Sequence, residues 1–456
     1  MSTLLDLGLC EAADQIRRRA ISAEDLVRAS VQAAETRGRA LNAVVAVEAE
    51  EALVRARALD AVTASGAELG PLHGVPLAHK DMYYRAGKIS ACGSKVRAGF
   101  VAPETSPLIS RLEQAGSVTI GRLHMAEFAM GPTGHNAHLG RCLNPWNPER
   151  ISGGSSSGSG AVVAARIAFG ALGSDTGGSV RLPAAMCGVV GLKPTQGLLP
   201  TDAMMGLSES LDCPGPLARS SRDVARLMDV MIGGGHEAGL AEPVAGLTLG
   251  IPRQFYWEDV EPVVAARLEE AKRVFAGLGI HIVPVDVPDH TVLADLADAV
   301  WTPEAAALHL PWLRTRADDY GPQLRARLAQ GLAMSATAYV QARQLRSLAL
   351  KSMVEGPLAR CDALFVPAMR CGTPTGEETD LTGGDKMRAI LAQISALTRP
   401  LSYLGLPGLV TPAGFDDNAM PVALQLIGRP REEGLLLRLA HAFEGATSWT
   451  RRKPGA

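Results

Sequence analysis

The sequence lacks a strong charge of either sign and lacks any long apolar run. Its 456 residues include 45 Lys and Arg against 47 Asp and Glu, which gives a net charge of −2. A chain without a basic excess is not expected to bind nucleic acid. No apolar stretch reaches the roughly 18 residues that a membrane-spanning helix needs, and residues 1–19 place acids before arginines, the reverse of a signal peptide. We therefore predict a cytoplasmic protein with neither a nucleic acid nor a membrane as partner.

Cysteine is also sparse, and its spacing argues against both disulfides and structural zinc sites. The seven cysteines are odd in number, widely spaced and never form a CxxC pair. We expect free thiols in a reducing compartment, with neither disulfides nor zinc. His124, His135 and His138 fall in one loop, but their spacings of 11 and 3 do not match HExxH. No metal and no cofactor are predicted.

What the chain does have is a long segment rich in serine and glycine. Residues 153–183 read GGSSSGSGAVVAARIAFGALGSDTGGSVRLP. The apolar run 161–172 is too short to span a bilayer, so we expect a buried helix that leads into a strand ending near Ser174. A helix and a strand that pack against each other bring the two polar ends together. The turn at 175–178 then offers backbone N–H groups beside the hydroxyl of Ser179, as acyl transfer requires.

The same segment resembles the amidase signature family. The matching motifs are GGSSSGSGAVVA, LGSDTGGSVRLPAAMCGVVGLKPT and, upstream at residues 74–81, GVPLAHKD. The resemblance implies that Ser179 is the nucleophile, that Ser155 is a bridging serine after a cis peptide bond, and that Lys80 is the base. It covers most of the chain and leaves out residues 285–360.

The resemblance also implies supporting residues around this triad. A lysine acts as a base only if burial brings its pKa from about 10.4 to roughly 7 to 8, and the apolar residues before Lys80 are typical of a buried strand. His79 would point to the opposite face of that strand and is expected to be structural. The expected oxyanion hole consists of the N–H groups of Thr176, Gly177, Gly178 and Ser179. The expected supporting side chains are Ser156, as a hydrogen-bond partner of Lys80, together with Asp175 and Arg181.

Two loops are expected to contact the substrate. In the family, the chain around Met130 and Gly131 lies beside it. Met204 and Met205 fall in a second loop, where adaptable apolar side chains suit a substrate pocket, although packing in the core is an equal alternative. The helical residues 285–360 resemble the family only loosely and are expected to set part of the substrate choice.

The remaining pattern predicts one α/β domain, residues 1–456, with a mixed open sheet covered by helices on both faces. Strands and helices alternate at 105–121 and at 247–287, and no repeat or linker divides the chain. The core is expected at about 65–250 and 360–445.

Together these features predict a hydrolase that cleaves carboxylic amide C–N bonds through a Ser-cisSer-Lys triad and an acyl-enzyme. A carbamate (urethane) or an ester would be attacked in the same way, so urethanase activity and small-molecule carbamate substrates are included. The oligomer expected is a homodimer.

Two alternatives remain open. The A-type subunit of amidotransferases, which supplies ammonia to misacylated tRNA, is similar in its core. That subgroup usually carries a YDGVRYG-type segment, which this chain with six tyrosines lacks, so we favour a stand-alone hydrolase. A serine–histidine esterase, with the GxSxG centred on Ser156 and with His441 as base, lacks the strand that should lead into its serine.

Overall fold

The computed structural model describes residues 4–380 and 384–455, without the side chains of 384–388. Within this range eleven strands form one mixed sheet in the order β1-β3-β2-β4-β6-β5-β10-β11-β9-β7-β8. The strands are β1 (Val44–Val47), β2 (Pro76–Lys80), β3 (Val118–Leu123), β4 (Gly170–Ser174), β5 (Val190–Lys193), β6 (Pro214–Ala218), β7 (Thr248–Pro252), β8 (His281–Val285), β9 (Ala363–Pro367), β10 (Gly408–Phe415) and β11 (Pro421–Ile427).

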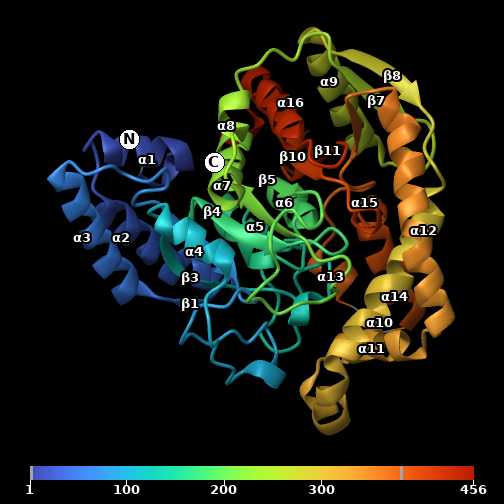
Figure 1. Cartoon of the computed structure of the whole chain (residues 1–456), viewed down its shortest axis with the longest axis horizontal. Helices are drawn as coiled ribbons and strands as arrows, with labels where there is room; N and C mark the ends of the chain where they lie inside the picture. Colours follow the sequence, from blue (N-terminus) through green and yellow to red (C-terminus); the bar gives the residue numbers. More distant parts are fainter. Residues whose placement is uncertain (1–3, 381–383, 456) are drawn as a thin grey trace.

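Helices flank this sheet, as the sequence predicts (Figure 1). The first three lie at one end of the molecule, and α10, α11, α12 and α14 gather at the other. The helices are α1 (Leu9–Arg17), α2 (Ala23–Ala33), α3 (Ala49–Ser65), α4 (Pro107–Gln114), α5 (Ser157–Ala164), α6 (Arg181–Cys187), α7 (Ser221–Ile232), α8 (His236–Gly239), α9 (Pro262–Gly277), α10 (His290–Arg316), α11 (Pro322–Ala333), α12 (Ala336–Glu355), α13 (Gly376–Thr379), α14 (Gly384–Ser395), α15 (Arg399–Leu404) and α16 (Glu433–Ala446).

Local sequence signals explain where several elements begin. Ser22 precedes α2, and its hydroxyl accepts a hydrogen bond from the Asp25 N–H at 3.0 Å, which satisfies one of the free donors of the first turn. At the start of α10, the Asp289 carboxylate accepts hydrogen bonds from the N–H groups of Thr291 and Val292. The loosely matching residues 285–360 are almost entirely helical, as predicted.

The central strands determine where the polar residues of the serine-rich segment lie. Strands β2 and β4 are parallel neighbours, so their carboxyl ends meet at the same edge of the sheet. Lys80 is the last residue of β2 and Ser174 the last of β4. Helix α5 runs back along the sheet before β4 and places Ser155 and Ser156 at this same edge. The predicted helix-to-strand segment is therefore present, and it brings its two ends together.

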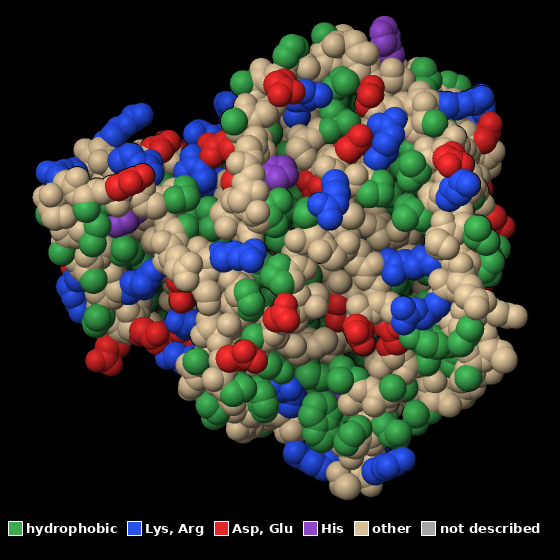
Figure 2. All heavy atoms as spheres, in the orientation of Figure 1, with side chains coloured by type: hydrophobic (Ala, Val, Ile, Leu, Met, Phe, Trp, Pro, Cys, Tyr) green, Lys and Arg blue, Asp and Glu red, His purple; other side chains and the backbone are tan. Residues whose placement is uncertain are grey.

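The surface agrees with the balanced composition. On the face drawn in Figure 2, Lys and Arg side chains are interspersed with Asp and Glu side chains. Among the helices described, none combines the length and the apolar character needed to cross a bilayer.

The core between α9 and α16 offers a test of the packing. Phe443 of α16 is fully buried, and its ring stacks on that of Phe275 at a centroid distance of 4.9 Å. We expect Phe443→Ala to lower the free energy of unfolding by about 3–5 kcal/mol, because it leaves a cavity. Leu348→Ala, at a position 64% exposed, is the control and should change it by less than about 0.5 kcal/mol. Urea unfolding followed by circular dichroism measures both, and equal midpoints for the two variants would contradict this packing.

Candidate active site

Lys80 lies between two serine hydroxyls at the edge of the sheet. Its Nζ is 2.7 Å from Ser155 Oγ and 2.8 Å from Ser174 Oγ, and all three side chains are buried. The peptide bond between Gly154 and Ser155 is cis, as the resemblance implies. Lys80 and Ser155, which lie 75 residues apart in the sequence, are therefore in direct contact.

Burial has a large effect on this lysine. It lowers the pKa of Lys80 to about 7, against the opposing attraction of the Asp212 and Asp175 carboxylates. A substantial fraction of Lys80 is thus neutral at pH 7 and able to accept a proton. Burial also lowers the pKa of the neighbouring His79 to about 3. The Nδ1 of His79 accepts a hydrogen bond from the Leu172 N–H, which is a structural role.

The second hydroxyl beside Lys80 comes from Ser174, and the expectation that Ser156 takes this place is wrong. Ser156 Oγ instead accepts a hydrogen bond from the Ser174 N–H at 3.2 Å. The Ser156 N–H donates to the backbone oxygen of Ser179 at 3.3 Å. Ser156 therefore ties the end of β4 to the turn that carries Ser179, and it supports the site through the backbone.

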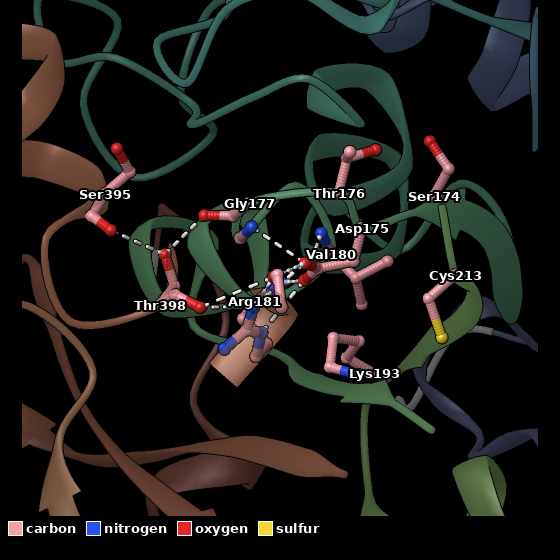
Figure 3. Close-up of polar contacts among 12 residues, drawn as sticks. Ser174, Asp175, Thr176, Gly177, Val180, Arg181, Lys193, Cys213, Ser395 and Thr398 are labelled. Carbon is pink, nitrogen blue, oxygen red and sulfur yellow. Dashed lines mark hydrogen bonds and ion pairs between the residues drawn. The ribbon is translucent and has the colours of Figure 1, made fainter. Parts of the chain in front are cut away.

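A buried ion pair holds that turn in place. The Arg181 guanidinium contacts Asp175 through two parallel bonds of 2.9 Å, Nε to Oδ2 and Nη2 to Oδ1, and both side chains are fully buried. Burial opposes ionisation of Asp175, but Arg181, together with Lys193 and the Val180 N–H, lowers the pKa of the carboxyl to about 2. Figure 3 shows this pair at the centre of the turn, with Thr398 beside it. The Thr398 hydroxyl donates to the Gly177 oxygen at 2.7 Å.

The N–H groups of the turn divide into two sets. Gly178 donates to Asp175 Oδ1 at 2.7 Å, so the expectation that its N–H belongs to the oxyanion hole is wrong: the carboxylate already occupies that donor. The N–H groups of Thr176, Gly177 and Ser179 have no acceptor within the described chain. These three remain as candidate anion donors.

A pocket opens over Ser179. It encloses about 490 Å³ of space, part of it open to solvent. Met130 and Gly131 line it, where the resemblance expects a substrate contact. The other lining residues are Ala129, Pro132, Thr176, Gly177, Ser179, Leu182, Leu207, Trp301, Arg327, Leu391, Ser395 and Arg399.

The two methionines expected in this wall lie elsewhere. Met204 forms a β-bridge with Tyr83, and Met205 Sδ contacts the Arg97 guanidinium. Both methionines are buried in the hydrophobic core. The alternative of core packing is therefore the one observed, and the nearby apolar side chain that reaches the pocket is Leu207.

Four other lining residues belong to no motif of the sequence. Trp301 and Arg327 come from α10 and α11, inside the loosely matching region, and Ser395 and Arg399 come from the ends of α14 and α15. An arginine on an amphipathic helix is ordinarily expected on a solvated face. Only the packing of these helices brings the side chains over Ser179.

The histidines that might have suggested a metal site or a base lie in separate places. His124 Nε2 lies 2.9 Å from the Gly140 oxygen, and His138 Nε2 lies 2.9 Å from Glu127 Oε1. His135 Nε2 lies 2.9 Å from the Thr379 hydroxyl. Among the residues that the structure describes, no group of three or more His, Cys, Asp or Glu side chains is arranged to hold a metal ion. His441 lies on α16 and lines a different pocket from the one over Ser179.

The ion pair gives a prediction about stability. We expect Arg181→Met to lower the free energy of unfolding by about 3–5 kcal/mol, because it leaves the Asp175 carboxylate buried without its partner. Arg17→Met is the matched control, since Arg17 pairs with Asp14 at the surface, and its cost should stay below about 1 kcal/mol. Differential scanning calorimetry compares the two, and a similar small effect for both would show that the buried pair does not hold the turn.

Known proteins resemble this chain over nearly its whole length. A family model described as Amidase matches residues 25–437. The chain is 35% identical to the A-type subunit of glutamyl-tRNA(Gln) amidotransferase from Geobacter metallireducens, over 491 aligned positions that cover 99% of each chain. The solved structure "An unexpected vestigial protein complex reveals the evolutionary origins of an s-triazine catabolic enzyme" has a TM-score of 0.90 and 31% identity, and covers 96% of this chain and 98% of that one. Peptide amidase of Stenotrophomonas maltophilia has a TM-score of 0.84 and 27% identity, with 98% of both chains covered.

The family match and the similar structures extend over nearly the whole sequence, including the motifs around Lys80, Ser155 and Ser179. The chain belongs to the Amidase family, the family of amidase signature enzymes.

Proposed function

We propose that this chain hydrolyses the C–N bond of a small carboxamide, with Ser179 as nucleophile, Ser155 as proton relay and Lys80 as general base. One observation carries the proposal: a buried lysine with a pKa of about 7 lies 2.7 Å from the Ser155 hydroxyl. A lysine with an ordinary pKa of about 10.4 holds its proton at pH 7, whereas this one can take a proton from a serine.

The reaction follows in two halves. Ser179 Oγ attacks the carbonyl carbon, and its proton moves through Ser155 to Lys80. The developing oxyanion is bound by free N–H groups of the turn, each of which typically contributes about 3 to 4 kcal/mol. Lys80 returns the proton through Ser155 to the leaving nitrogen, the C–N bond breaks, and an ester on Ser179 remains. Water attacks this ester by the same route, which releases the carboxylic acid and restores the serine.

Carbamates and esters belong to the same proposal as secondary substrates. Each presents a carbonyl carbon to Ser179, and the leaving group is an amine or an alcohol. The apolar side chains of Met130, Leu182 and Trp301 in the wall support contacts with the carbon skeleton of such a molecule. The seven free thiols support the expectation of a reducing, cytoplasmic setting, and the single continuous sheet supports one domain.

A second candidate is an amidotransferase A-type subunit, which would pass the released ammonia to a partner protein. The curated relative supports this candidate more directly than it supports a stand-alone hydrolase. One observation favours the hydrolase: the tyrosine-rich segment is absent from the sequence. Both candidates share the chemistry at Ser179 and differ in the fate of the ammonia.

Substitution of the triad tests this shared chemistry. We expect Ser179→Ala and Lys80→Ala each to lower kcat more than about a thousandfold, because they remove the nucleophile and the base. His441→Ala, in a separate pocket, is the control and should stay within about twofold of wild type. The measurement is product release from a panel of aryl amides, carbamates and esters. Dependence on His441 with Lys80 dispensable would instead support a serine–histidine esterase.

Addition of a partner separates the two candidates. The purified chain alone should release ammonia from small amides at a rate that does not change when an amidotransferase's other subunits are added. Activity that appears only with those subunits would favour the amidotransferase candidate.

The pKa of Lys80 gives a pH prediction. The base acts in its neutral form, so kcat/KM for an uncharged amide should rise with pH and reach half its maximum near pH 7, where Lys80 loses its proton. Initial rates between pH 5.5 and 9 provide the profile. A rate that is flat through this range, or that falls as pH rises through 7, would exclude Lys80 as the base.

A further inference from the structure

Asp212 is a buried carboxylate that joins two parts of the pocket over Ser179. It is only 5% exposed. Its Oδ1 accepts a hydrogen bond from the Thr176 hydroxyl at 2.5 Å, and its Oδ2 accepts hydrogen bonds from the N–H groups of Leu207 at 2.7 Å and Ser208 at 3.1 Å. Thr176 and Leu207 both line the pocket. The carboxylate therefore connects the turn that carries the nucleophile to a second segment of the lining.

The charge of Asp212 acts on Lys80. The three hydrogen-bond donors to Asp212 in the described chain are uncharged. Burial raises the pKa of this carboxyl, and its three donors and the charge of Lys80 oppose the rise. In the other direction, Asp212 favours the protonated form of Lys80 more than Asp175 or Cys92 does, although burial outweighs all three and lowers the pKa of Lys80. The carboxylate and the predicted base thus interact without direct contact.

The turn around Thr176 needs anchors outside itself. Gly177 and Gly178 follow Thr176, and glycine restrains the backbone little. The Asp175 carboxylate holds the Gly178 N–H, whereas the Thr176 side chain is held by Asp212. The Thr176 N–H is one of the candidate anion donors. Such a donor stabilises an oxyanion best when it is in place before the charge develops, so the hydroxyl contact with Asp212 bears directly on this donor.

The segment on the other side of Asp212 is also held in place. Glu304 Oε2, on α10, accepts hydrogen bonds from the Ser208 hydroxyl at 2.6 Å and from the Ser210 N–H at 3.0 Å. Glu304 Oε1 accepts a hydrogen bond from the Tyr339 hydroxyl of α12 at 2.9 Å. The N–H groups that bind Asp212 therefore belong to a fixed segment, and the carboxylate has a defined position from which to hold Thr176.

We propose that Asp212 is a positioning residue for acyl transfer, which holds the Thr176 N–H in the oxyanion hole and stabilises Lys80 once it has taken up the serine proton. In that step the proton of Ser179 ends on Lys80, which changes from a neutral amine to a cation, while Asp212 exchanges no proton with the substrate. A buried cation is costly unless a carboxylate is near. The inference rests on the proposed hydrolysis at Ser179 and adds a residue to it.

Asp212→Asn tests both roles with an uncharged amide as substrate. Asparagine has nearly the same shape but no negative charge, and its NH₂ cannot accept the bonds that the carboxylate accepts. We expect kcat to fall about 10- to 100-fold with KM within about threefold of wild type. The pH at which kcat/KM reaches half its maximum should move to lower values, because a charge that favours protonated Lys80 is gone. Asp223→Asn is the matched control: Asp223 is 3% exposed and accepts the Cys10 N–H, and the variant should keep kcat within about twofold and the wild-type midpoint.

A double-mutant cycle tests the contact itself. Thr176→Val removes the hydroxyl but keeps the N–H and nearly the same shape, and it should also lower kcat about tenfold or more. Because both substitutions break one contact, the Thr176→Val/Asp212→Asn variant should lose much less than the product of the two single losses. Losses that multiply, or an unchanged pH midpoint in Asp212→Asn, would show a purely structural role and overturn the inference. Should Asp212→Asn not fold, wild-type kcat in Thr176→Val would overturn it.

Covalent labelling keeps the test independent of the amide chosen. With a fluorophosphonate, the Ser179 oxygen bonds to phosphorus, fluoride leaves, and the serine proton passes to the base. Mass spectrometry should show Ser179 labelled more slowly in Asp212→Asn than in wild type and Asp223→Asn. Such labelling without amide hydrolysis by wild type would retain the inference and contradict the proposed function. Wild-type kcat and midpoint in Asp212→Asn would overturn the inference and leave the proposed function. Neither labelling nor hydrolysis in wild type would overturn both.

Discussion

The buried pair of Asp175 and Arg181 is the interaction on which the rest of the site depends. A desolvated carboxylate and guanidinium are tolerated only when nearly every donor and acceptor is used. Here the carboxylate takes N–H groups of the turn at Gly178 and Val180, and the guanidinium reaches Gln425 Oε1 of β11 at 2.9 Å. Segments more than 200 residues apart thus meet at one ion pair, which fixes the backbone that carries Ser179.

The same pair affects the electrostatics around Lys80. The low pKa of this lysine needs an apolar surrounding, and a bare carboxylate nearby would raise it again. Asp212 has the larger effect of this kind and Asp175 the next, and burial outweighs both. The two serine hydroxyls that touch Lys80 carry no charge, and each accepts a hydrogen bond from its Nζ. The ion pair thus holds the turn in place, while the low pKa of Lys80 comes from burial.

The parts of the site that the sequence predicts are those with a contiguous motif or a clear period. The apolar run inside the serine-rich segment predicts α5 and β4, and parallel pairing of β2 with β4 then brings Lys80 to Ser155. Which hydroxyl faces the lysine could not be predicted, because Ser174 and Ser156 differ only in the direction that the folded backbone gives them. The hydrogen bond from the Gly178 N–H to Asp175 depends on the rotamer of Asp175, so the sequence could not predict it either. Arg327 lies in a helix whose sequence gives no sign of facing the pocket rather than solvent.

The site residues that the sequence predicts and those that it does not predict lie in different parts of the pocket lining. Its lining combines residues of the serine-rich segment with a wall of residues from α10, α11, α14 and α15, which lie in the second half of the chain. Several hydrogen bonds join the two parts: Arg181 donates to the Thr398 oxygen and to the Ser402 hydroxyl, and the Thr398 hydroxyl donates to the Gly177 oxygen. Because the hydrogen bonds of Lys80 do not involve the wall, substitutions in α10 and α11 can change which molecule is held without changing how the C–N bond is attacked. This separation gives a physical reason why substrate choice must be derived from the wall.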